Sequence, residues 1–376
     1  MSSIIVDVRS LEEWQYDGHA ECTVNYPLDK FPSYIESLRT YDKVVLVCRS
    51  GNRANHAMDL LKKAGIKNVE NKGTWQNVNC AKINGEAKPQ KEKIDTPRTE
   101  TLKVLIPTDF SVQAEYAYIM VQRLAERANI DIHFAHVLDV PDTVTMGKNG
   151  TIETCGEIDA GYVTSQKNIV ERKLNNLKTL YGEDIQTHLI LGKVTQATVK
   201  FAEENDFDLV VMGTKGAWGL KEMLSGTEAQ SIARRSKVPL LTLMCDRSDL
   251  DIENILLVHD FTKNEKADLK LIHKLIKAFN TKIHLLQVVP RQTEREEQAT
   301  LEAMKQFAAH NKLTNIQTHI IKDSDVEKGV THFAQLSIMD IICIGTHGKG
   351  GFFHKSATEK LINHLFKPII SFHLEA

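Results

Sequence analysis

One cysteine stands where the chain could present a reactive thiol. Residues 43–48 read KVVLVC, an apolar run typical of a buried strand, and the loop CRSGNR leads into a helical stretch over 54–64. Cys48 therefore ends a strand just before a helix begins, where open α/β sheets bind ligands. Loop N–H groups and the flanking Arg49 and Arg53 would favour the thiolate, the nucleophilic form. This pattern predicts nucleophilic chemistry at Cys48.

The length of the loop separates two kinds of chemistry. Arg53 follows Cys48 by five residues, which gives the spacing C-x4-R. Loops of the tyrosine-phosphatase type use C-x5-R, one residue more, to encircle a phosphate. The shorter loop favours sulfur over phosphate as the group that Cys48 handles.

A second pattern could hold phosphate. Met212-Gly213-Thr-Lys215-Gly216 is followed, after nine residues, by Gly226-Thr227-Glu228, which gives G-x2-G-x9-G-[ST]. Glycines let the backbone approach a phosphate, and the helix expected near Thr227 would add N–H donors and a positive dipole. The Thr227 hydroxyl and the Lys215 charge could contribute. The pattern is neither a Walker A loop nor the dinucleotide GxGxxG.

The elements that would position these loops come from an internal duplication. The matched segments are LKVLIPTDFS (102–111) with NILLVHDFT (254–262), IHFAHV (132–137) with IHLLQV (283–288), IQTHLI (185–190) with IQTHII (316–321), and DLVVMGTKG (208–216) with DIICIGTHG (340–348). Continuous apolar strands suit a parallel sheet buried on both faces, and their alternation with helices predicts a doubly wound layer fold. Ser111 is a candidate helix cap, and the first copy's extra residues 142–160 read as a loop.

Each copy ends in an edge-type strand that begins at a proline, after Val238 and after Lys367. Proline is tolerated at a strand start. We expect the two copies to pair through these strands as an internal pseudo-dimer, and a further homodimer stays open. Residues 86–100 hold two prolines and one strongly apolar residue, so they read as a linker. The expected units are residues 1–85, the linker 86–100, and the copies 101–247 and 251–376.

Over about residues 3–80 the chain resembles the rhodanese family. The resemblance rests on Asp7-Val-Arg9, Gly18-His19 with Asn25-Tyr-Pro27, Gly73-Thr-Trp75 and the loop CRSGNR. It implies that Cys48 accepts sulfane sulfur and passes it to a thiophilic acceptor, with Arg49 and Arg53 assisting. The persulfide would lie in the loop formed by Ser50, Gly51 and Asn52. Cys22 could resolve a persulfide as a disulfide, but a lone packing cysteine is the favoured interpretation.

Over about residues 101–246 the chain resembles the nucleotide-binding branch of the universal stress protein family. That resemblance implies that Asp109 faces the nucleoside of ATP and that the Val137 backbone contacts adenine. The phosphate side would be lined by Met212, Gly213, Lys215, Gly216, Gly226, Thr227 and Glu228. Residues 251–376 resemble the same family with a damaged loop, because Ala357 replaces the glycine and the loop is one residue shorter. A weaker second nucleotide site would use Asp260, Gly345, Gly348 and Thr358.

Composition excludes several classes. The chain has 376 residues, 47 basic and 49 acidic, with 42% hydrophobic residues, so no basic excess points to nucleic acid. No apolar run reaches the length of a membrane helix, and Asp7 and Arg9 stand where a signal peptide would be apolar. Six dispersed cysteines without CxxC argue against a disulfide scaffold and a cysteine zinc site. We therefore expect a cytoplasmic α/β protein that needs no metal.

Three functions fit these patterns. The first is a sulfurtransferase, with a small-molecule sulfur donor and acceptor, whose first duplicated copy binds ATP. The second is a stress protein that senses ATP without catalysis and uses its N-terminal unit as a docking module. The third, an ATP hydrolase, lacks a Walker motif, a clear general base and a pair of metal-binding carboxylates. The intact CRSGNR loop favours the first.

Overall fold

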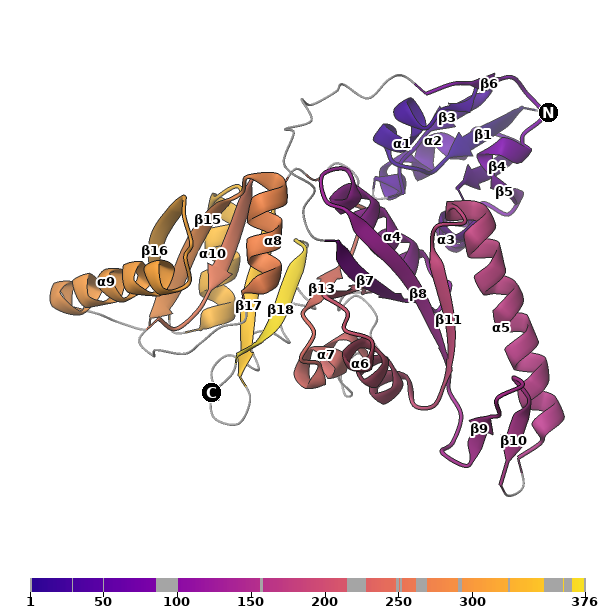
Figure 1. Cartoon of the computed structure of the whole chain (residues 1–376). Helices are drawn as coiled ribbons and strands as arrows, with labels where there is room; N and C mark the ends of the chain where they lie inside the picture. Colours follow the sequence, from indigo (N-terminus) through magenta and orange to yellow (C-terminus); the bar gives the residue numbers. More distant parts are fainter. Residues whose placement is uncertain are drawn as a thin grey trace.

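The structure is a computed structural model. It describes residues 2–28, 30–49, 51–85, 101–155, 158–214, 228–247, 250, 252–261, 269–289, 293–323, 325–347, 361 and 367–374. The expected linker and several predicted site residues lie outside the described residues: Ser50, Lys215, Gly216, Gly226, Thr227, Gly348 and Thr358. The described chain forms a small N-terminal parallel sheet and one long sheet built from two similar halves (Figure 1).

The N-terminal sheet has the strand order β3-β1-β4-β5, and every neighbouring pair is parallel. Val6, Leu46 and Cys48 are fully buried because both faces of this sheet are covered. Its elements are β1 (Ser3–Asp7), α1 (Leu11–Tyr16), β2 (His19–Ala20), β3 (Thr23–Asn25), the 3-10 turn Phe31–Tyr34, α2 (Ile35–Leu38), β4 (Lys43–Cys48), α3 (Asn52–Lys63), β5 (Val69–Thr74), the 3-10 turn Trp75–Asn77 and β6 (Lys82–Ile83).

The first half of the long sheet follows the expected alternation of strand and helix. Its elements are β7 (Leu102–Pro107), α4 (Val112–Ala125), β8 (Ile130–Leu138), β9 (Val144–Met146), β10 (Ile152–Thr154), α5 (Ala160–Tyr181), β11 (Gln186–Leu191), α6 (Val194–Glu204), β12 (Leu209–Gly213), α7 (Glu228–Arg235) and β13 (Leu240–Leu243). The Ser111 side chain accepts from the Ala114 N–H and caps α4, as predicted. The extra segment is not a plain loop, because β9 and β10 pair as a hairpin and Val144 packs against Val163 of α5.

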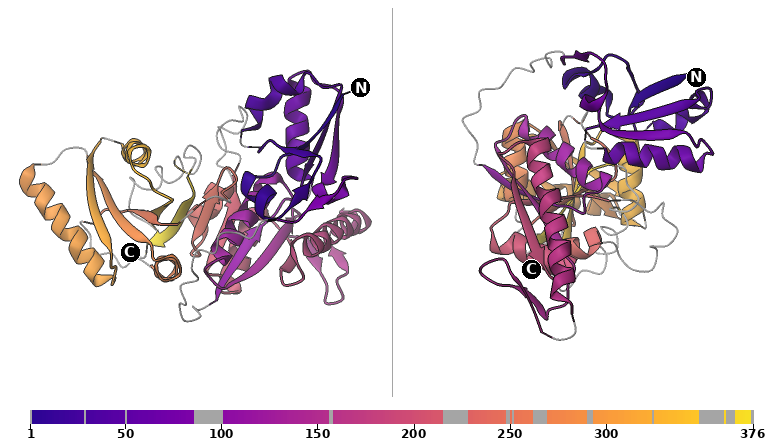
Figure 2. Two further views of the ribbon diagram at one scale, coloured as in Figure 1. Left: turned by 90° about the horizontal axis from the view of Figure 1, so that it is seen from above. Right: turned by 90° about the vertical axis from the view of Figure 1, so that its right-hand side faces the viewer.

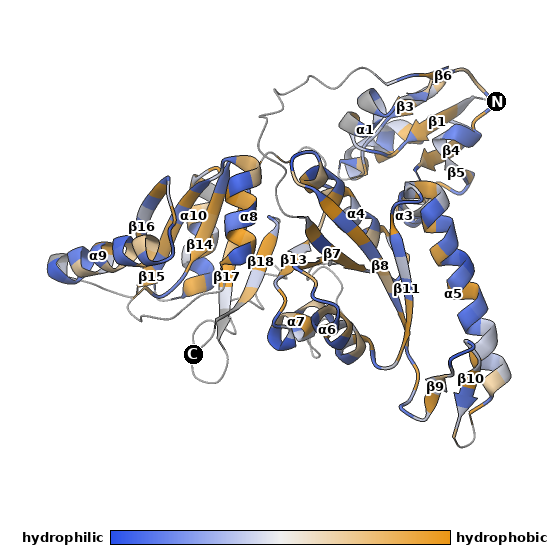
Figure 3. Cartoon of the chain, in the orientation of Figure 1, coloured by the Kyte–Doolittle hydropathy of each residue, from blue (hydrophilic) through white to orange (hydrophobic). Residues whose placement is uncertain are grey.

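The second half repeats this arrangement without the hairpin. Its elements are β14 (Asn254–Val258), α8 (Lys270–Phe279), β15 (Lys282–Val289), α9 (Glu294–His310), β16 (Ile316–Lys322), α10 (Val326–Leu336), β17 (Ile341–His347) and β18 (Ile369–Leu374). The strands of both halves are the most apolar parts of the ribbon, whereas α5 and α9 carry mostly polar residues (Figure 3). This contrast is typical of a sheet buried between helical layers.

The two halves join into one ten-stranded sheet. Its order is β11-β8-β7-β12-β13-β18-β17-β14-β15-β16, and only the central pair, β13 with β18, is antiparallel. Leu240 faces Ser371, and Leu241 faces Ile370, across this junction. The expected pairing of two doubly wound halves as an internal pseudo-dimer is confirmed. Figure 2 shows the halves side by side, with the N-terminal sheet placed against the first.

A histidine pair recurs at the same place in both halves. His133 Nδ1 lies 2.8 Å from His188 Nε2 between β8 and β11, and His284 Nδ1 lies 3.0 Å from His319 Nε2 between β15 and β16. Burial and the neighbouring His319 lower the pKa of His284 to about 4. Each pair therefore joins a sheet strand to its outer neighbour through a contact between imidazole rings.

Candidate functional sites

Cys48 lies where the sequence predicts it, at the carboxyl end of β4 and directly before α3. The Gly51 N–H donates to Cys48 Sγ over 3.0 Å. Gly51 has φ 95°, and a Cβ there would lie 3.2 Å from the Gly73 Cα, so this turn of the loop needs glycine. The backbone thus aims a donor at the sulfur. We call residues 48–53 the Cys48 loop.

The two loop arginines are held by carboxylates. Arg53 contacts Glu13 at 2.5 Å, Glu115 at 3.0 Å and Asp246 at 3.2 Å. Arg49 contacts Asp17 at 2.5 Å and donates to Gln122 Oε1 over 2.9 Å. Glu13 and Asp17 belong to the N-terminal unit, whereas the partners Glu115, Gln122 and Asp246 come from the first half of the long sheet.

The thiol is less acidic than its loop suggests. Cys48 has no exposed surface. Burial and the nearby Glu115 carboxylate raise the pKa of Cys48, and Arg53 with the N–H groups of Ala54 and Gly51 offsets this only in part. The sequence predicts a thiolate from the arginines and the loop; this arrangement favours the thiol instead, because residues distant in sequence bury the sulfur and supply a like charge.

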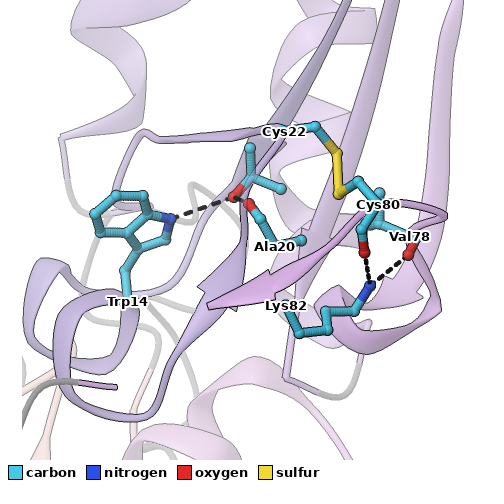
Figure 4. Close-up of a disulfide and its surroundings, with 7 residues drawn as sticks. Trp14, Ala20, Cys22, Val78, Cys80 and Lys82 are labelled. Atoms are coloured by element: carbon cyan, nitrogen blue, oxygen red, sulfur yellow. Dashed lines mark hydrogen bonds between the residues drawn. A yellow bond between two sulfur atoms is a disulfide. The ribbon is translucent and has the colours of Figure 1, made fainter. Parts of the chain in front are cut away.

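Cys22 is not a lone packing cysteine; that prediction is wrong. It forms a disulfide with Cys80, and the two Cα atoms are 6.2 Å apart (Figure 4). Antiparallel pairing of β2 with β6 brings them together, since Ala20 faces Lys82. The Lys82 ammonium donates to the carbonyls of Val78 and Cys80 and holds the turn at Cys80. A separation of 58 residues in the chain concealed this pair from spacing arguments.

The first half of the long sheet gathers its predicted nucleotide residues at one edge. β12 is parallel to β7, and β7 is parallel to β8, so their carboxyl ends lie together. Asp109 follows β7 and is exposed, Val137 is the penultimate residue of β8, and Met212 and Gly213 end β12. Glu228 opens α7 close by: burial, then Asp109 and Asp139, raise its pKa. The described members of the prediction therefore converge.

Three further residues at this edge escaped the sequence argument. His136 Nδ1 lies 2.7 Å from the Thr108 carbonyl oxygen, and its ring stacks on Phe110, whose φ is 63°. The Thr214 hydroxyl is buried and has no hydrogen-bond partner among the described residues. An unsatisfied hydroxyl beside the glycine-rich segment fits a polar ligand. The signal in the sequence was position alone, since each residue adjoins a strand end.

Gly213 has a packing role of its own. A Cβ at Gly213 would lie 1.9 Å from the Gln113 carbonyl oxygen, in the first turn of α4. The glycine pattern was interpreted as room for a phosphate. At Gly213 the close neighbour is instead the backbone of the helix that also carries Glu115.

The equivalent edge of the second half is arranged differently. Asp260 accepts a hydrogen bond from Gln287 Nε2 over 3.2 Å, and Gln287 stands where the first half has His136. Asp109 instead accepts from the N–H of Ser111, two residues on, over 2.9 Å. Gly345 lies within β17, opposite Phe372 of β18. The second carboxylate is thus bound to a neighbouring strand.

Two further observations apply to the described residues. Among them, no helix is both long and apolar enough to cross a membrane. In the same part of the chain, His, Cys, Asp and Glu form no group of three or more that could hold a metal ion.

Comparison with known proteins agrees with this division of the chain. Residues 1–75 match the rhodanese-like domain, and residues 101–243 match the universal stress protein family. A universal stress protein from Methanocaldococcus jannaschii is 27% identical over 141 residues, which are 38% of this chain and 81% of that protein. A mitochondrial protein of Schizosaccharomyces pombe, whose name proposes thiosulfate sulfurtransferase activity, is 35% identical over 88 residues, 20% of this chain and 61% of that protein.

The crystal structure of a universal stress protein from Archaeoglobus fulgidus extends the likeness of fold to both halves. It covers 72% of this chain and 96% of its own length, with a TM-score of 0.54 and 18% identity. The chain therefore carries a rhodanese-like domain over residues 1–75 and a universal stress protein domain over residues 101–243.

Proposed function

We propose that the rhodanese-like domain is a sulfurtransferase with Cys48 as its nucleophile. The observation that carries this proposal is the Gly51 N–H aimed at Cys48 Sγ over 3.0 Å, at the junction of β4 and α3. An N–H in that position can stabilise negative charge on sulfur, in the thiolate or in a persulfide. The rhodanese-like match and the sulfurtransferase relative support the same chemistry.

The reaction consists of two displacements. The Cys48 thiolate attacks the outer sulfur of thiosulfate, the sulfur–sulfur bond of thiosulfate breaks, and sulfite leaves with the bonding electron pair. Cys48 then carries a persulfide. Cyanide, or a thiolate acceptor, attacks the terminal sulfur and leaves with it, and the Cys48 thiolate returns. Arg49 and Arg53 can neutralise the anionic donor only where their present carboxylate partners yield to it.

The test is the intact mass of the protein before and after thiosulfate. We expect one added sulfur that cyanide removes and that Cys48→Ser never acquires. Cys155→Ser is the matched control, because Cys155 is a free cysteine on the exposed surface. A folded protein that gains no sulfur from thiosulfate or from an organic persulfide would favour the alternative, a docking module whose buried thiol is structural.

We also propose that the first half of the long sheet binds ATP. Asp109 would hold the ribose, the Val137 backbone would contact adenine, and the Thr214 hydroxyl would join the phosphate side. The buried, unpartnered Thr214 oxygen is the described feature that fits such a ligand. The remaining predicted contacts are Met212, Gly213, Lys215, Gly216, Gly226, Thr227 and Glu228, and the second half would bind more weakly through Asp260, Gly345, Gly348 and Thr358.

Calorimetric titration with ATP tests this assignment. Asp109→Ala combined with Gly226→Ala should abolish binding, and Thr214→Val should weaken it because the hydroxyl is lost while the shape is kept. If the double variant bound ATP with unchanged affinity, the site would have to be assigned to the second half, and if neither half bound ATP, no site would remain.

A further inference from the structure

The Cys48 loop is covered by the neighbouring domain. Arg53 lies only 1% exposed between Glu13 of its own domain and two carboxylates of the first half, Glu115 on α4 and Asp246 after β13. On the other side of the sulfur, Arg49 reaches Gln122, two turns further along α4. Helix α3, which follows the loop, contacts α4 (Figure 1). One helix therefore spans the loop from Arg53 to Arg49.

The contact also adds negative groups beside the two arginines. Within the rhodanese-like domain, Arg49 and Arg53 face Glu13 and Asp17, which makes two positive and two negative groups. Contact with the first half adds the carboxylates Glu115 and Asp246 to the partners of Arg53. Burial opposes the charge of Glu13, yet Arg53 and Arg49 hold its pKa well below the usual range, so Glu13 stays ionised. These two added carboxylates would oppose the approach of a dianion such as thiosulfate.

We propose that Glu115 and Asp246 are closing carboxylates, which hold the Cys48 loop shut against the first half of the long sheet, and that sulfur reaches Cys48 only when the two domains separate. The inference rests on the proposed sulfur transfer for its purpose, but the closure itself is a property of the fold. Separation would expose the sulfur and remove these two carboxylates from the loop. Arg53 would keep Glu13 as a partner and regain water.

The closure has a defined link to the nucleotide edge. Glu115 lies four residues after the Ser111 cap of α4, and the preceding turn packs its Gln113 carbonyl against Gly213. The contact with Arg53, through Glu115, and the contact with β12, through Gln113, therefore arise within one turn of the same helix, roughly 3 Å apart along its axis. A movement of the start of α4 would therefore alter both contacts.

The test compares how fast iodoacetamide labels Cys48. The reagent is neutral but reacts with the thiolate, so each rate is measured over a range of pH, which separates access to the sulfur from a change in the pKa of Cys48. Cys155, exposed and outside the contact, is the reference within the same molecule, and each site is read by peptide mass spectrometry. Glu115→Gln with Asp246→Asn should speed labelling of Cys48 about tenfold, since loss of buried charge pairs raises the rate at which an interface opens. Labelling of Cys155 should stay constant.

Two further variants serve as controls for the double substitution. Glu126→Gln lies on the exposed side of the same helix, where Glu126 pairs with Arg123, and should label like the parent protein. Gln122→Ala removes the contact with Arg49 without changing any charge, and should speed labelling two- to threefold even if the double variant folds poorly. A folded double variant and a Gln122→Ala variant that both label at the parent rate would overturn the closure.

A thiosulfate arm separates this inference from the proposed function. Faster labelling together with faster sulfur loading supports both. Faster labelling without any sulfur on Cys48 leaves the closure standing and removes the sulfurtransferase assignment.

Discussion

In the first half of the long sheet, Asp208 accepts a hydrogen bond from the Lys103 N–H over 2.9 Å; in the second half, Asp340 accepts from the Asn254 N–H over 2.8 Å. The histidine pairs match in the same way. At the opposite edge the halves differ. Asp109 accepts a hydrogen bond from the N–H of Ser111 in its own turn, whereas Asp260 accepts one from Gln287 on a neighbouring strand. Duplication has kept the contacts that fix strand register and altered those that would meet a ligand.

This comparison separates the contacts that both halves retain from the contacts that differ between them. Buried hydrogen bonds between strands are costly to break, so both halves retain them. In the first half, the edge at Asp109 also packs against the start of α4. The same helix holds Glu115, which contacts Arg53 of the Cys48 loop. We infer that only the first half combines these two duties, and the following experiments probe that contrast.

The largest effect should come from Gly213→Ala. Its methyl group would meet the Gln113 carbonyl oxygen at 1.9 Å, and neither backbone can yield easily. We expect the free energy of unfolding to fall by about 3 kcal/mol, measured by urea unfolding followed by circular dichroism. Gly161→Ala is the control, because its Cβ would meet only the Asp159 side chain at the start of α5. Equal stability of the two variants would contradict the tight seat of α4.

Acid should destabilise the second half through its histidine pair. An unfolded histidine binds its proton near pH 6.5, whereas folded His284 binds one only near pH 4. Between these values the unfolded chain holds more protons, so stability is complete above about pH 6.5 and falls as the pH drops, on the order of 2 kcal/mol in all. Replacing His284 and His319 by Gln should flatten this slope in urea midpoints measured from pH 7 to 4. A slope that survives unchanged would assign the acid sensitivity elsewhere.

A third test compares the two carboxylates at the ligand edge. Asp109→Ala should weaken ATP binding about tenfold, since a hydrogen bond to a charged group is lost. Asp260→Ala should change the measured affinity less than twofold, because Gln287 already occupies that carboxylate. Titration calorimetry on both variants decides the matter, and equal losses would mean that the halves share the ligand.

The smallest effect concerns the junction between the halves. Lys274 of α8 reaches across to Asp208 at 2.8 Å, and both side chains are partly exposed. Lys274→Ala should lower the free energy of unfolding by about 0.5 kcal/mol. Lys193→Ala breaks an ion pair with Asp139 that lies wholly within the first half and is more exposed, so it should have no measurable effect. A reversed order of the two effects would refute a role for Lys274 in joining the halves.

Strand patterns in the sequence were sufficient to predict the layer fold, the duplication and the pairing of the two copies, because strands buried in a parallel sheet are continuous apolar runs. The antiparallel direction of that pairing came from the structure. Cys48 and the edge at Asp109 were predicted for a similar reason, since each follows such a strand. The cover over Cys48 was not predictable in this way. Glu115 and Asp246 lie 62 and 193 residues from Arg53, and no local pattern reports a contact between domains.

The disulfide and the histidine pairs show the same limit on a smaller scale. Cys22 and Cys80 meet because the two-residue strands β2 and β6, distant in sequence, pair antiparallel. The repeated IQTH segments were visible as a duplication, but the ring-to-ring hydrogen bonds depend on which strands lie adjacent. A contact between residues that are distant in sequence can be predicted only when it is known which strands lie adjacent.

The antiparallel pair at the centre of the long sheet joins two halves of one chain. This affects how the halves can evolve and whether they separate when the protein is diluted. In a symmetric homodimer every substitution appears twice, so one subunit cannot specialise alone. Here β13 and β18 belong to one chain, and one partner can change while the other keeps its original form. Association is also independent of protein concentration, because no second molecule has to be found. A scarce protein of this architecture would stay paired where a two-chain equivalent would dissociate.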